Sequence, residues 1–366
     1  MPPSDAPSRD APRTVPDGIF RGARTLSIMP TYTCPAACTH CASLSSPQVR
    51  TGIPLQVILD AIREAFELGF HNVVFTGGEA TLRWSDLLRS IEYACELGLP
   101  TRLVTNAHWA RSVEIATRKL TQLVDAGLDE INFSTGDEHA RFIPVERVAC
   151  AAVAAARRGF RSWIMVELRA ERRVCAETVR THPLIAALAP AERELIEVAE
   201  SPWMPLSPAE IAAYPDGLPA DGMNLKSHMN CPNVLQTYTV QADGRVGACC
   251  GIGMRTIPEL SVATVDQAGF LARAIEEAES DFLKLWMHYK GPEQILAWAA
   301  TKNPTIRWRG MYAHRCQACA RVYKDPAIAR VIESHYEEML IDVLQSAWFD
   351  ERFVPTATGT PTGAQP

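Results

Sequence analysis

Hydrophobic and polar positions in the first 205 residues follow two alternating patterns. Short apolar runs predict buried strands, and longer segments with apolar residues at helical spacing predict amphipathic helices, most of them ended by a glycine. The predicted strands are Leu26 to Met29, Asn72 to Phe75, Arg102 to Thr105, Glu130 to Phe133, Trp163 to Leu168 and Leu195 to Ala199. The predicted helices are Pro54 to Gly69, Trp84 to Leu97, Val113 to Val124, Val145 to Arg158 and one between Ala176 and Leu188.

Strand–helix repeats of this kind predict an α/β fold with a parallel sheet and helices outside it. A closed eight-unit barrel usually needs about 250 residues. These six units occupy only about 180 residues, which suits an open, partial (β/α)6 barrel. In α/β barrels the chemistry lies at the carboxyl ends of the strands, so functional side chains are expected directly after strands.

Composition narrows the class of protein. The chain has 366 residues, of which 47% are hydrophobic, and a formal net charge of -6. It has no long basic run and no apolar run of transmembrane length, which argues against nucleic acid and membrane as partners. Residues 1–24 lack the apolar core of a signal peptide and, like residues 351–366, are expected to be disordered tails. We therefore expect a cytoplasmic protein, in which eleven cysteines indicate metal or redox chemistry rather than disulfides.

Three of the cysteines follow the first predicted strand at C-x3-C-x2-C spacing: Cys34, Cys38 and Cys41. Thiolates are soft ligands that bind iron–sulfur clusters, zinc or Cu(I). Three thiolates on a four-iron cluster leave one iron open to a substrate or cofactor. A zinc knuckle and a chance group of buried thiols are the alternatives.

The cysteine spacing resembles the signature of radical S-adenosylmethionine (radical SAM) enzymes, with His40 at a position that is usually aromatic in that family. After the second strand, Thr76-Gly77-Gly78-Glu79 looks like the family's GGE motif, which binds the amino group of SAM. By position after strands 3, 4 and 5, the resemblance implies that Asn106, Ser134, Glu167 and Arg169 also contact SAM. A capping role for Ser134 and a surface role for Arg169 are the alternatives. The sequence does not single out a catalytic acid or base.

A second cysteine set lies beyond a linker around residues 205–225. Cys231 and Cys249 flank a predicted hairpin that turns at Asp243-Gly244, and Cys316-x2-Cys319 comes much later. Four thiolates suit zinc or a [4Fe–4S] cluster. The pattern resembles the SPASM extension of radical SAM enzymes in its shorter twitch form, which implies one auxiliary cluster, with Cys250 an alternative to Cys249. We expect a core over 25–225, a small α+β twitch-like domain over 226–324 and a C-terminal helix over 325–350.

The resemblance implies that SAM is reductively cleaved to a 5′-deoxyadenosyl radical, which abstracts hydrogen from a substrate. A one-electron donor such as flavodoxin or ferredoxin is implied as a partner. The substrate is expected to be a peptide that is oxidised or crosslinked. The alternatives are dehydrogenation or epimerisation of a small molecule such as an aminosugar, and a zinc-stabilised binding module without catalysis.

Overall fold

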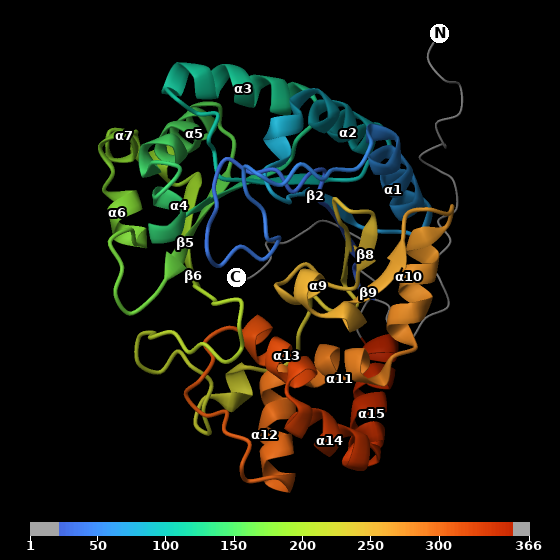
Figure 1. Ribbon diagram of the computed structural model, residues 1–366. Coiled ribbons are helices and arrows are strands. Elements are labelled where there is room, and N and C mark those ends of the chain that lie inside the picture. The colour runs from blue at the N-terminus through green and yellow to red at the C-terminus, as the bar shows by residue number, and fades with distance from the viewer. Residues whose placement is uncertain (1–21, 354–366) are drawn as a thin grey trace.

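The computed structural model describes residues 22–353, and the expected tails lie almost wholly outside this range. A nine-stranded sheet forms the centre of the molecule, in the order β6-β5-β4-β3-β2-β1-β7-β8-β9 (Figure 1). The strands are β1 (Thr25–Ile28), β2 (Asn72–Phe75), β3 (Thr101–Thr105), β4 (Glu130–Thr135), β5 (Ser162–Leu168), β6 (Ile196–Pro202), β7 (Thr237–Val240), β8 (Arg245–Gly247) and β9 (Ser261–Thr264).

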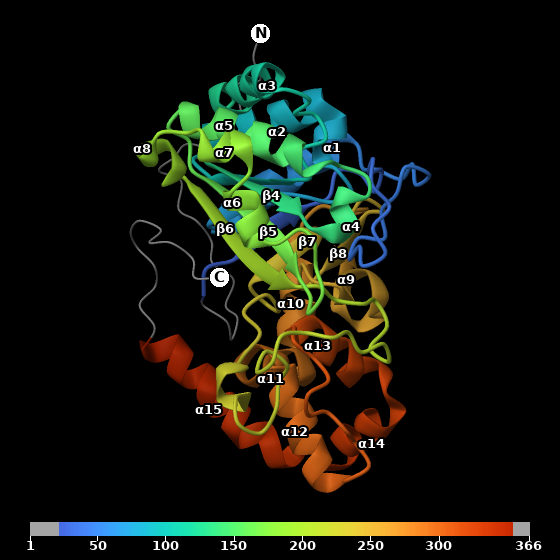
Figure 2. The ribbon, with the colours of Figure 1, turned by 90° about the vertical axis from the view of Figure 1, so that its left-hand side faces the viewer.

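The first six strands are parallel, and consecutive strands are neighbours in the sheet. Helices cover the outer face of the curved sheet (Figure 2). They are α1 (Leu55–Glu67), α2 (Trp84–Glu96), α3 (Val113–Asp125), α5 (Val145–Arg157), α6 (Ala176–Arg180), α7 (Pro183–Ala186) and α8 (Pro190–Arg193), whereas the short α4 (Asp137–Ala140) lies at the carboxyl end of β4. The prediction of a partial (β/α)6 barrel is therefore confirmed. The helix expected between Ala176 and Leu188 is two short helices, because His182-Pro183 begins a new helix with its own cap.

The barrel core depends on small and branched residues that the helices place against the strands. In α5, nine consecutive residues from Val148 to Ala156 are buried, and seven of them are Ala or Cys. Small side chains on every side of a helix let it lie close to the sheet and to its neighbouring helices. The Ala-rich sequence of α5 therefore reflects the close packing of this helix against the sheet and its neighbouring helices.

The C-terminal part does not form a sheet of its own. Strand β7 pairs in parallel with β1, from Thr25 opposite Thr237 to Ile28 opposite Val240, and β8 and β9 extend the same sheet antiparallel. The predicted hairpin is present, but it borders the cysteine loop that follows β1. This pairing places the hairpin, which Cys249 and Cys250 follow, beside β1.

Helices complete the C-terminal part: α9 (Gly253–Thr256), α10 (Phe270–Glu279), α11 (Phe282–Lys290), α12 (Pro292–Lys302), α13 (Arg315–Lys324), α14 (Pro326–His335) and α15 (Glu337–Phe353). The single helix expected over 325–350 is divided between α14 and α15 at Tyr336. Within the described residues, no helix has both the length and the apolar character needed to cross a membrane.

Candidate active site

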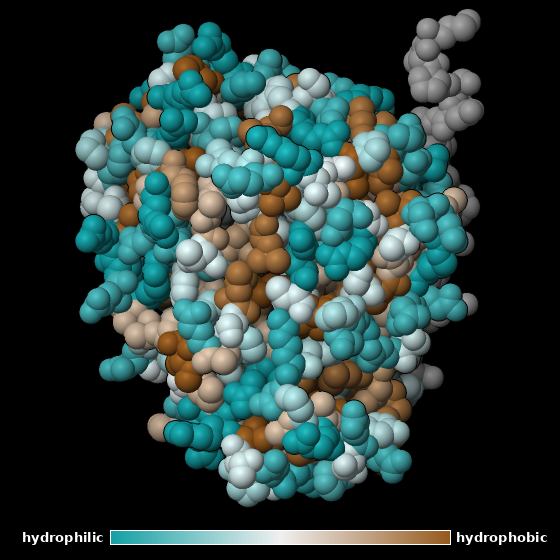
Figure 3. Space-filling model, in the orientation of Figure 1, coloured by the Kyte–Doolittle hydropathy of each residue, from teal (hydrophilic) through white to brown (hydrophobic). Residues whose placement is uncertain are grey.

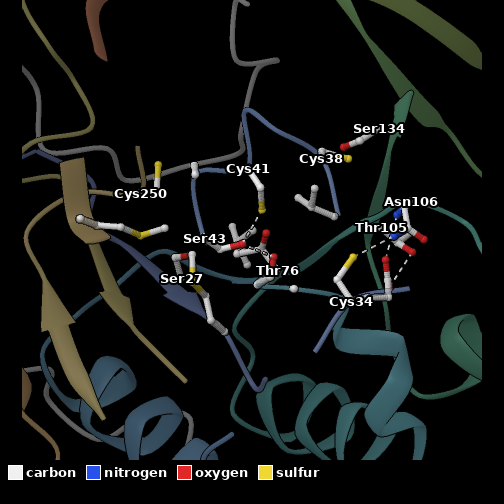
Figure 4. A pocket seen from close by; sticks show the side chains of 18 of the residues that line it. Ser27, Cys34, Cys38, Cys41, Ser43, Thr76, Thr105, Asn106, Ser134 and Cys250 are labelled. Carbon is white, nitrogen blue, oxygen red and sulfur yellow. Dashed lines mark hydrogen bonds between the residues drawn. The ribbon is translucent and has the colours of Figure 1, made fainter. Parts of the chain in front are cut away.

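A cavity of about 530 Å³ lies inside the open barrel at the carboxyl ends of β1 to β4. Inward-facing residues of β1, β2 and β3 form its floor, and the cysteine loop forms one wall. Figure 4 shows the sulfurs of Cys34, Cys38 and Cys41 around one space, with Cys250 on the side away from Cys34 and Cys38. The cavity volume lies in the range of small-molecule binding sites.

The cysteine loop is held by backbone contacts with the turn after β2. The amide of Gly78 donates to Thr31 O at 2.9 Å, and the amide of Glu79 donates to Thr33 O at 2.9 Å. A Cβ atom on Gly78 would lie 2.4 Å from Thr33 O, so only glycine permits this approach. Gly77 and Gly78 thus form part of the cavity wall and also let the turn after β2 contact the cysteine loop. The sequence did not predict this second role.

One serine side chain and one backbone amide contact the third cysteine, Cys41. Cys41 Sγ lies 3.2 Å from Ser43 Oγ, and the Ser45 amide donates to the same sulfur at 3.4 Å. Ser43 Oγ also donates to Gly77 O at 3.2 Å, which links the cysteine to the turn after β2. On the other side of the loop, Asn106 Nδ2 lies 3.5 Å from Cys34 Sγ. Donors aimed at sulfur favour a thiolate, the form that binds metals.

Glu79 is fully engaged within the protein. Its Oε1 accepts hydrogen bonds from Thr81 and from Thr105 Oγ1 at 2.8 Å, and its Oε2 accepts from the Asn106 amide at 2.9 Å. The side chain is only 2% exposed and lies on the cavity wall. It therefore ties the ends of β2 and β3 together beneath the cysteine loop. Thr105, which sequence reasoning missed, is part of this arrangement.

The predicted cofactor contacts divide into two groups. Thr76, Gly77, Gly78, Glu79, Asn106 and Ser134 all line the cavity. In the described structure, Glu167 and Arg169 do not line it. Glu167 instead accepts from the Glu138 amide at 2.9 Å and lies 2.6 Å from His139 Nδ1, while Arg169 lies 3.7 Å from Glu167 and stacks over Trp203.

The histidines at this edge do line the cavity, so they connect Glu167 to it. His40 Nε2 lies 3.4 Å from Glu167 Oε1, and the His40 and His139 rings contact each other edge to face. Burial raises the pKa of Glu167, but its hydrogen bond with His139 and its electrostatic interactions with both histidines bring it below its ordinary value. Burial lowers the pKa of His40 to about 4, so this ring is neutral near pH 7.

The C-terminal part also contributes to the cavity and to the loop. Cys250, Met254, Asn233 and Thr237 line the cavity from this side. Arg255 lies over the Tyr32 ring at 3.8 Å and donates to Ser43 O at 3.2 Å. Sequence reasoning missed these residues because it treated the C-terminal part as separate from the barrel.

The second cysteine set lies deeper in the protein. Cys231, Cys249 and Cys319 are buried, and Cys316 is half-buried against Gly251. Burial raises the pKa of Cys34, Cys38 and Cys316 to about 12. The pKa of Cys319 is raised by burial and further by the nearby charges of Cys231, Cys249 and Cys316, which indicates that these four thiols share one region.

Sulfur spacing separates two kinds of metal site. Tetrahedral zinc with Zn–S bonds of about 2.3 Å needs sulfurs roughly 3.8 Å apart. Within residues 22–353, any three of the cysteine sulfurs include at least one pair more than 4.8 Å apart. Among these residues, no three cysteine sulfurs therefore lie at the spacing of a tetrahedral zinc site.

Comparison with known proteins agrees with this geometry. Residues 28–191 match the model of the radical SAM superfamily. PqqA peptide cyclase of Methylocella silvestris is 29% identical over 112 residues, covering 30% of this chain and 28% of the relative. PqqA peptide cyclase of Bradyrhizobium diazoefficiens is 32% identical over 108 residues, covering 28% of this chain and 26% of the relative. The chain therefore aligns with little more than a quarter of the length of these curated relatives.

Two solved structures share the fold. Native anSMEcpe with bound AdoMet and Cp18Cys peptide has a TM-score of 0.52 at 14% identity, covering 89% of this chain and 99% of that one. Streptococcus suis SuiB bound to the precursor peptide SuiA has a TM-score of 0.52 at 14% identity, covering 72% of this chain and 67% of that one. At this identity the likeness shows the fold, which extends beyond the barrel into the C-terminal part.

Proposed function

Because residues 28–191 match the model of the radical SAM superfamily, we propose that this chain is an enzyme that cleaves SAM reductively and uses the product to oxidise or crosslink a peptide. A [4Fe–4S] cluster on Cys34, Cys38 and Cys41, when bound, supplies the electron that converts SAM to methionine and a 5′-deoxyadenosyl radical. The chain itself binds the two reactants, orients them and excludes water.

The observation that carries the proposal is the placement of the three cysteines on the wall of a cavity. Cys34, Cys38 and Cys41 border the same space as the turn Thr76 to Glu79. A cluster held by three thiolates keeps one iron without a protein ligand, and here that iron would have an adjoining cavity for SAM. A metal site enclosed by protein on all sides lacks such space.

Within this proposal, SAM lies between the cysteine loop and the ends of β2 to β4. Thr76, Gly77, Gly78, Asn106 and Ser134 are its proposed contacts. Glu79 supports the same wall from beneath. Glu167 and Arg169 act through the two histidines, because Glu167 orients His139 and His40 at the cavity edge.

Cys231, Cys249, Cys316 and Cys319 are the proposed ligands of one auxiliary [4Fe–4S] cluster. Removing one hydrogen atom from a substrate leaves a carbon radical, and forming a double bond or a crosslink from that radical releases one electron and one proton. The auxiliary cluster would accept the electron. A flavodoxin or ferredoxin is the proposed partner that exchanges electrons with the enzyme.

The peptide substrate rests on the similar proteins. Both curated relatives are named PqqA peptide cyclase, and both solved structures that share the fold contain a bound peptide. The face of the molecule that contains the barrel opening has apolar side chains along its middle (Figure 3). Leu44, in the cysteine loop, is 40% exposed. Apolar groups beside an opening suit an extended peptide better than a free sugar.

The test uses protein purified and reconstituted without oxygen. About eight irons per chain are expected from two four-iron clusters, and SAM with dithionite should give 5′-deoxyadenosine. Co-expression with each short peptide encoded beside the gene, followed by mass spectrometry, should reveal a loss of two hydrogens. Zinc without iron, or no 5′-deoxyadenosine, would overturn the proposal. Modification of a small molecule alone would replace the peptide as substrate.

A further inference from the structure

Positive charge gathers around the second C-x2-C motif. Residues 301–324 contain six Lys and Arg residues and no Asp or Glu, in a chain whose formal net charge is -6. Two of the six are neutralised, because Lys302 pairs with Glu338 and Arg321 with Asp325. Arg307, Arg309 and Arg315 have no carboxylate within 4.0 Å among residues 22–353. Their charge is therefore available to a partner.

Two of these arginines, Arg309 and Arg315, lie beside a loop with exposed methionines. The amide of Ala220 donates to Tyr312 O at 2.8 Å and the amide of Gly310 donates to Ala220 O at 2.8 Å, so the loop 220–230 runs beside the segment 307–316. In this loop Met223 is 96% exposed and Met229 is 52% exposed. We call Met223, Met229, Arg307, Arg309 and Arg315 the basic face.

Contacts at the residues next to the methionines join this loop to two arginines. The nearest side chain to Gly222, which precedes Met223, is the guanidinium of Arg309. Arg315 Nη1 donates to Asn230 O at 2.8 Å, next to Met229. Asp221 is the acidic residue of this loop, and its Oδ1 accepts from the amides of Met223 and Asn224. Exposed methionines with unpaired arginines are typical of adaptable protein-binding surfaces.

One edge of the basic face adjoins the proposed auxiliary site. Arg315 precedes Cys316 in the chain, and Asn230, whose carbonyl it binds, precedes Cys231. The hydrogen bond between Arg315 and Asn230 therefore joins the residue before Cys316 to the residue before Cys231. Both cysteines are proposed cluster ligands. Electron transfer falls steeply with distance, so a carrier that docks here approaches this cluster without entering the barrel.

We propose that the basic face docks an acidic one-electron carrier protein, which exchanges electrons with the auxiliary cluster. This inference rests on the proposed function. SAM cleavage consumes one electron, and oxidation of the substrate radical releases one. The released electron passes to the cluster and then to the oxidised carrier, which is reduced by one electron while the cluster returns to its oxidised state. Opposite charges guide such partners into contact.

The same contact allows transfer from a reduced carrier to the oxidised cluster, and this direction is measured without a substrate. The protein is the full chain carrying Cys34→Ala, Cys38→Ala and Cys41→Ala, reconstituted so that iron is confined to the auxiliary site. Stopped-flow absorbance follows cluster reduction by flavodoxin hydroquinone, an acidic probe, at several salt concentrations. Dithionite, which needs no protein docking, is the comparison reductant.

Arg307→Glu/Arg309→Glu is expected to slow reduction by flavodoxin at least tenfold at low salt, roughly the effect of losing electrostatic guidance. Its iron content and its reduction by dithionite should not change. The matched control is Arg157→Glu/Arg158→Glu, an equal charge change at exposed residues of the barrel. An unchanged flavodoxin rate, or equal slowing by both variants, would overturn the docking proposal. In the wild-type protein, 5′-deoxyadenosine formed with dithionite tests the proposed function separately.

Discussion

The two cysteine sets differ in how the chain brings them together and in what surrounds them. Cys34, Cys38 and Cys41 come from one loop of eight residues that borders a cavity, and Cys38 and Cys41 are partly exposed. Cys231, Cys249, Cys316 and Cys319 come from three distant segments, and three of them are buried. The first set has space beside it for a ligand. The second is packed within protein, which suits a cluster that only carries electrons.

Contacts within one chain segment therefore contribute to the first set, whereas the second set depends on contacts between distant segments. The loop set has contacts within its own segment, to Ser43 and Ser45, and is also held by the turn after β2. The second set depends on pairing of β7 with β1 and on packing of α13. Removing a ligand from the loop should stop the chemistry, whereas removing a ligand from the second set should stop only steps that need its electron.

The largest effect is expected from Cys38→Ala. Two thiolates do not hold the loop cluster, so SAM cleavage should fall to background and iron should fall from about eight to about four per chain. Iron analysis and chromatography of 5′-deoxyadenosine measure both changes.

Cys95→Ala is the control for that variant, because Cys95 is an exposed residue of α2 far from either set in sequence. It should leave both quantities unchanged. Full 5′-deoxyadenosine formation by Cys38→Ala would contradict the assignment of the loop.

A second comparison separates two neighbouring cysteines. Cys249 is buried near Cys319, whereas Cys250 lines the barrel cavity. Cys249→Ala should lose about four irons per chain and the oxidised product, yet keep dithionite-driven SAM cleavage. Cys250→Ala should keep all of its iron. The reverse pattern in iron analysis would make Cys250 the ligand.

Gly78→Ala should disturb the loop set with a smaller effect. Its Cβ would lie 2.4 Å from Thr33 O, which is backbone and moves only with the cysteine loop. We expect a loss of stability of about 1–3 kcal/mol from overpacking and a fall in SAM cleavage of roughly tenfold to a hundredfold from misplaced groups. Thermal unfolding and 5′-deoxyadenosine assays measure these changes.

Gly98→Ala is the matched variant, because Gly98 has a φ of +76° but no atom within 4 Å of an added Cβ. It should cost about 1 kcal/mol from the left-handed backbone alone. Its SAM cleavage should equal that of the wild type. If both variants lost cleavage equally, close packing under the loop would not be the cause.

The smallest expected difference is kinetic. The loop set adjoins a cavity, so a chelator with trace oxygen should remove its iron several-fold faster than iron from the buried set. Bound SAM should narrow this difference, because it fills the cavity. Mössbauer spectra taken over time distinguish the two sets, and loss at one common rate would show that burial does not protect the second.

The sequence predicted the features that depend on local pattern. Apolar runs and helical spacing located all six barrel strands, because short apolar strands and amphipathic helices leave distinct patterns in the sequence. The C-x3-C-x2-C spacing and the Gly-Gly-Glu turn were readable because their residues are close in the chain. The hairpin between Cys231 and Cys249 was predicted from its turn, Asp243-Gly244, for the same reason.

Tertiary structure alone decided how distant segments meet. Pairing of β7 with β1 makes the C-terminal part an extension of the barrel and brings Cys250 and Met254 to the cavity. The engagement of Glu79 by Thr105 and of Glu167 by His139 depends on neighbouring strand ends, and no sequence period records such contacts. Local pattern fixes which segments are strands and helices, whereas strand partners and side-chain contacts depend on the packing free energy of the whole chain.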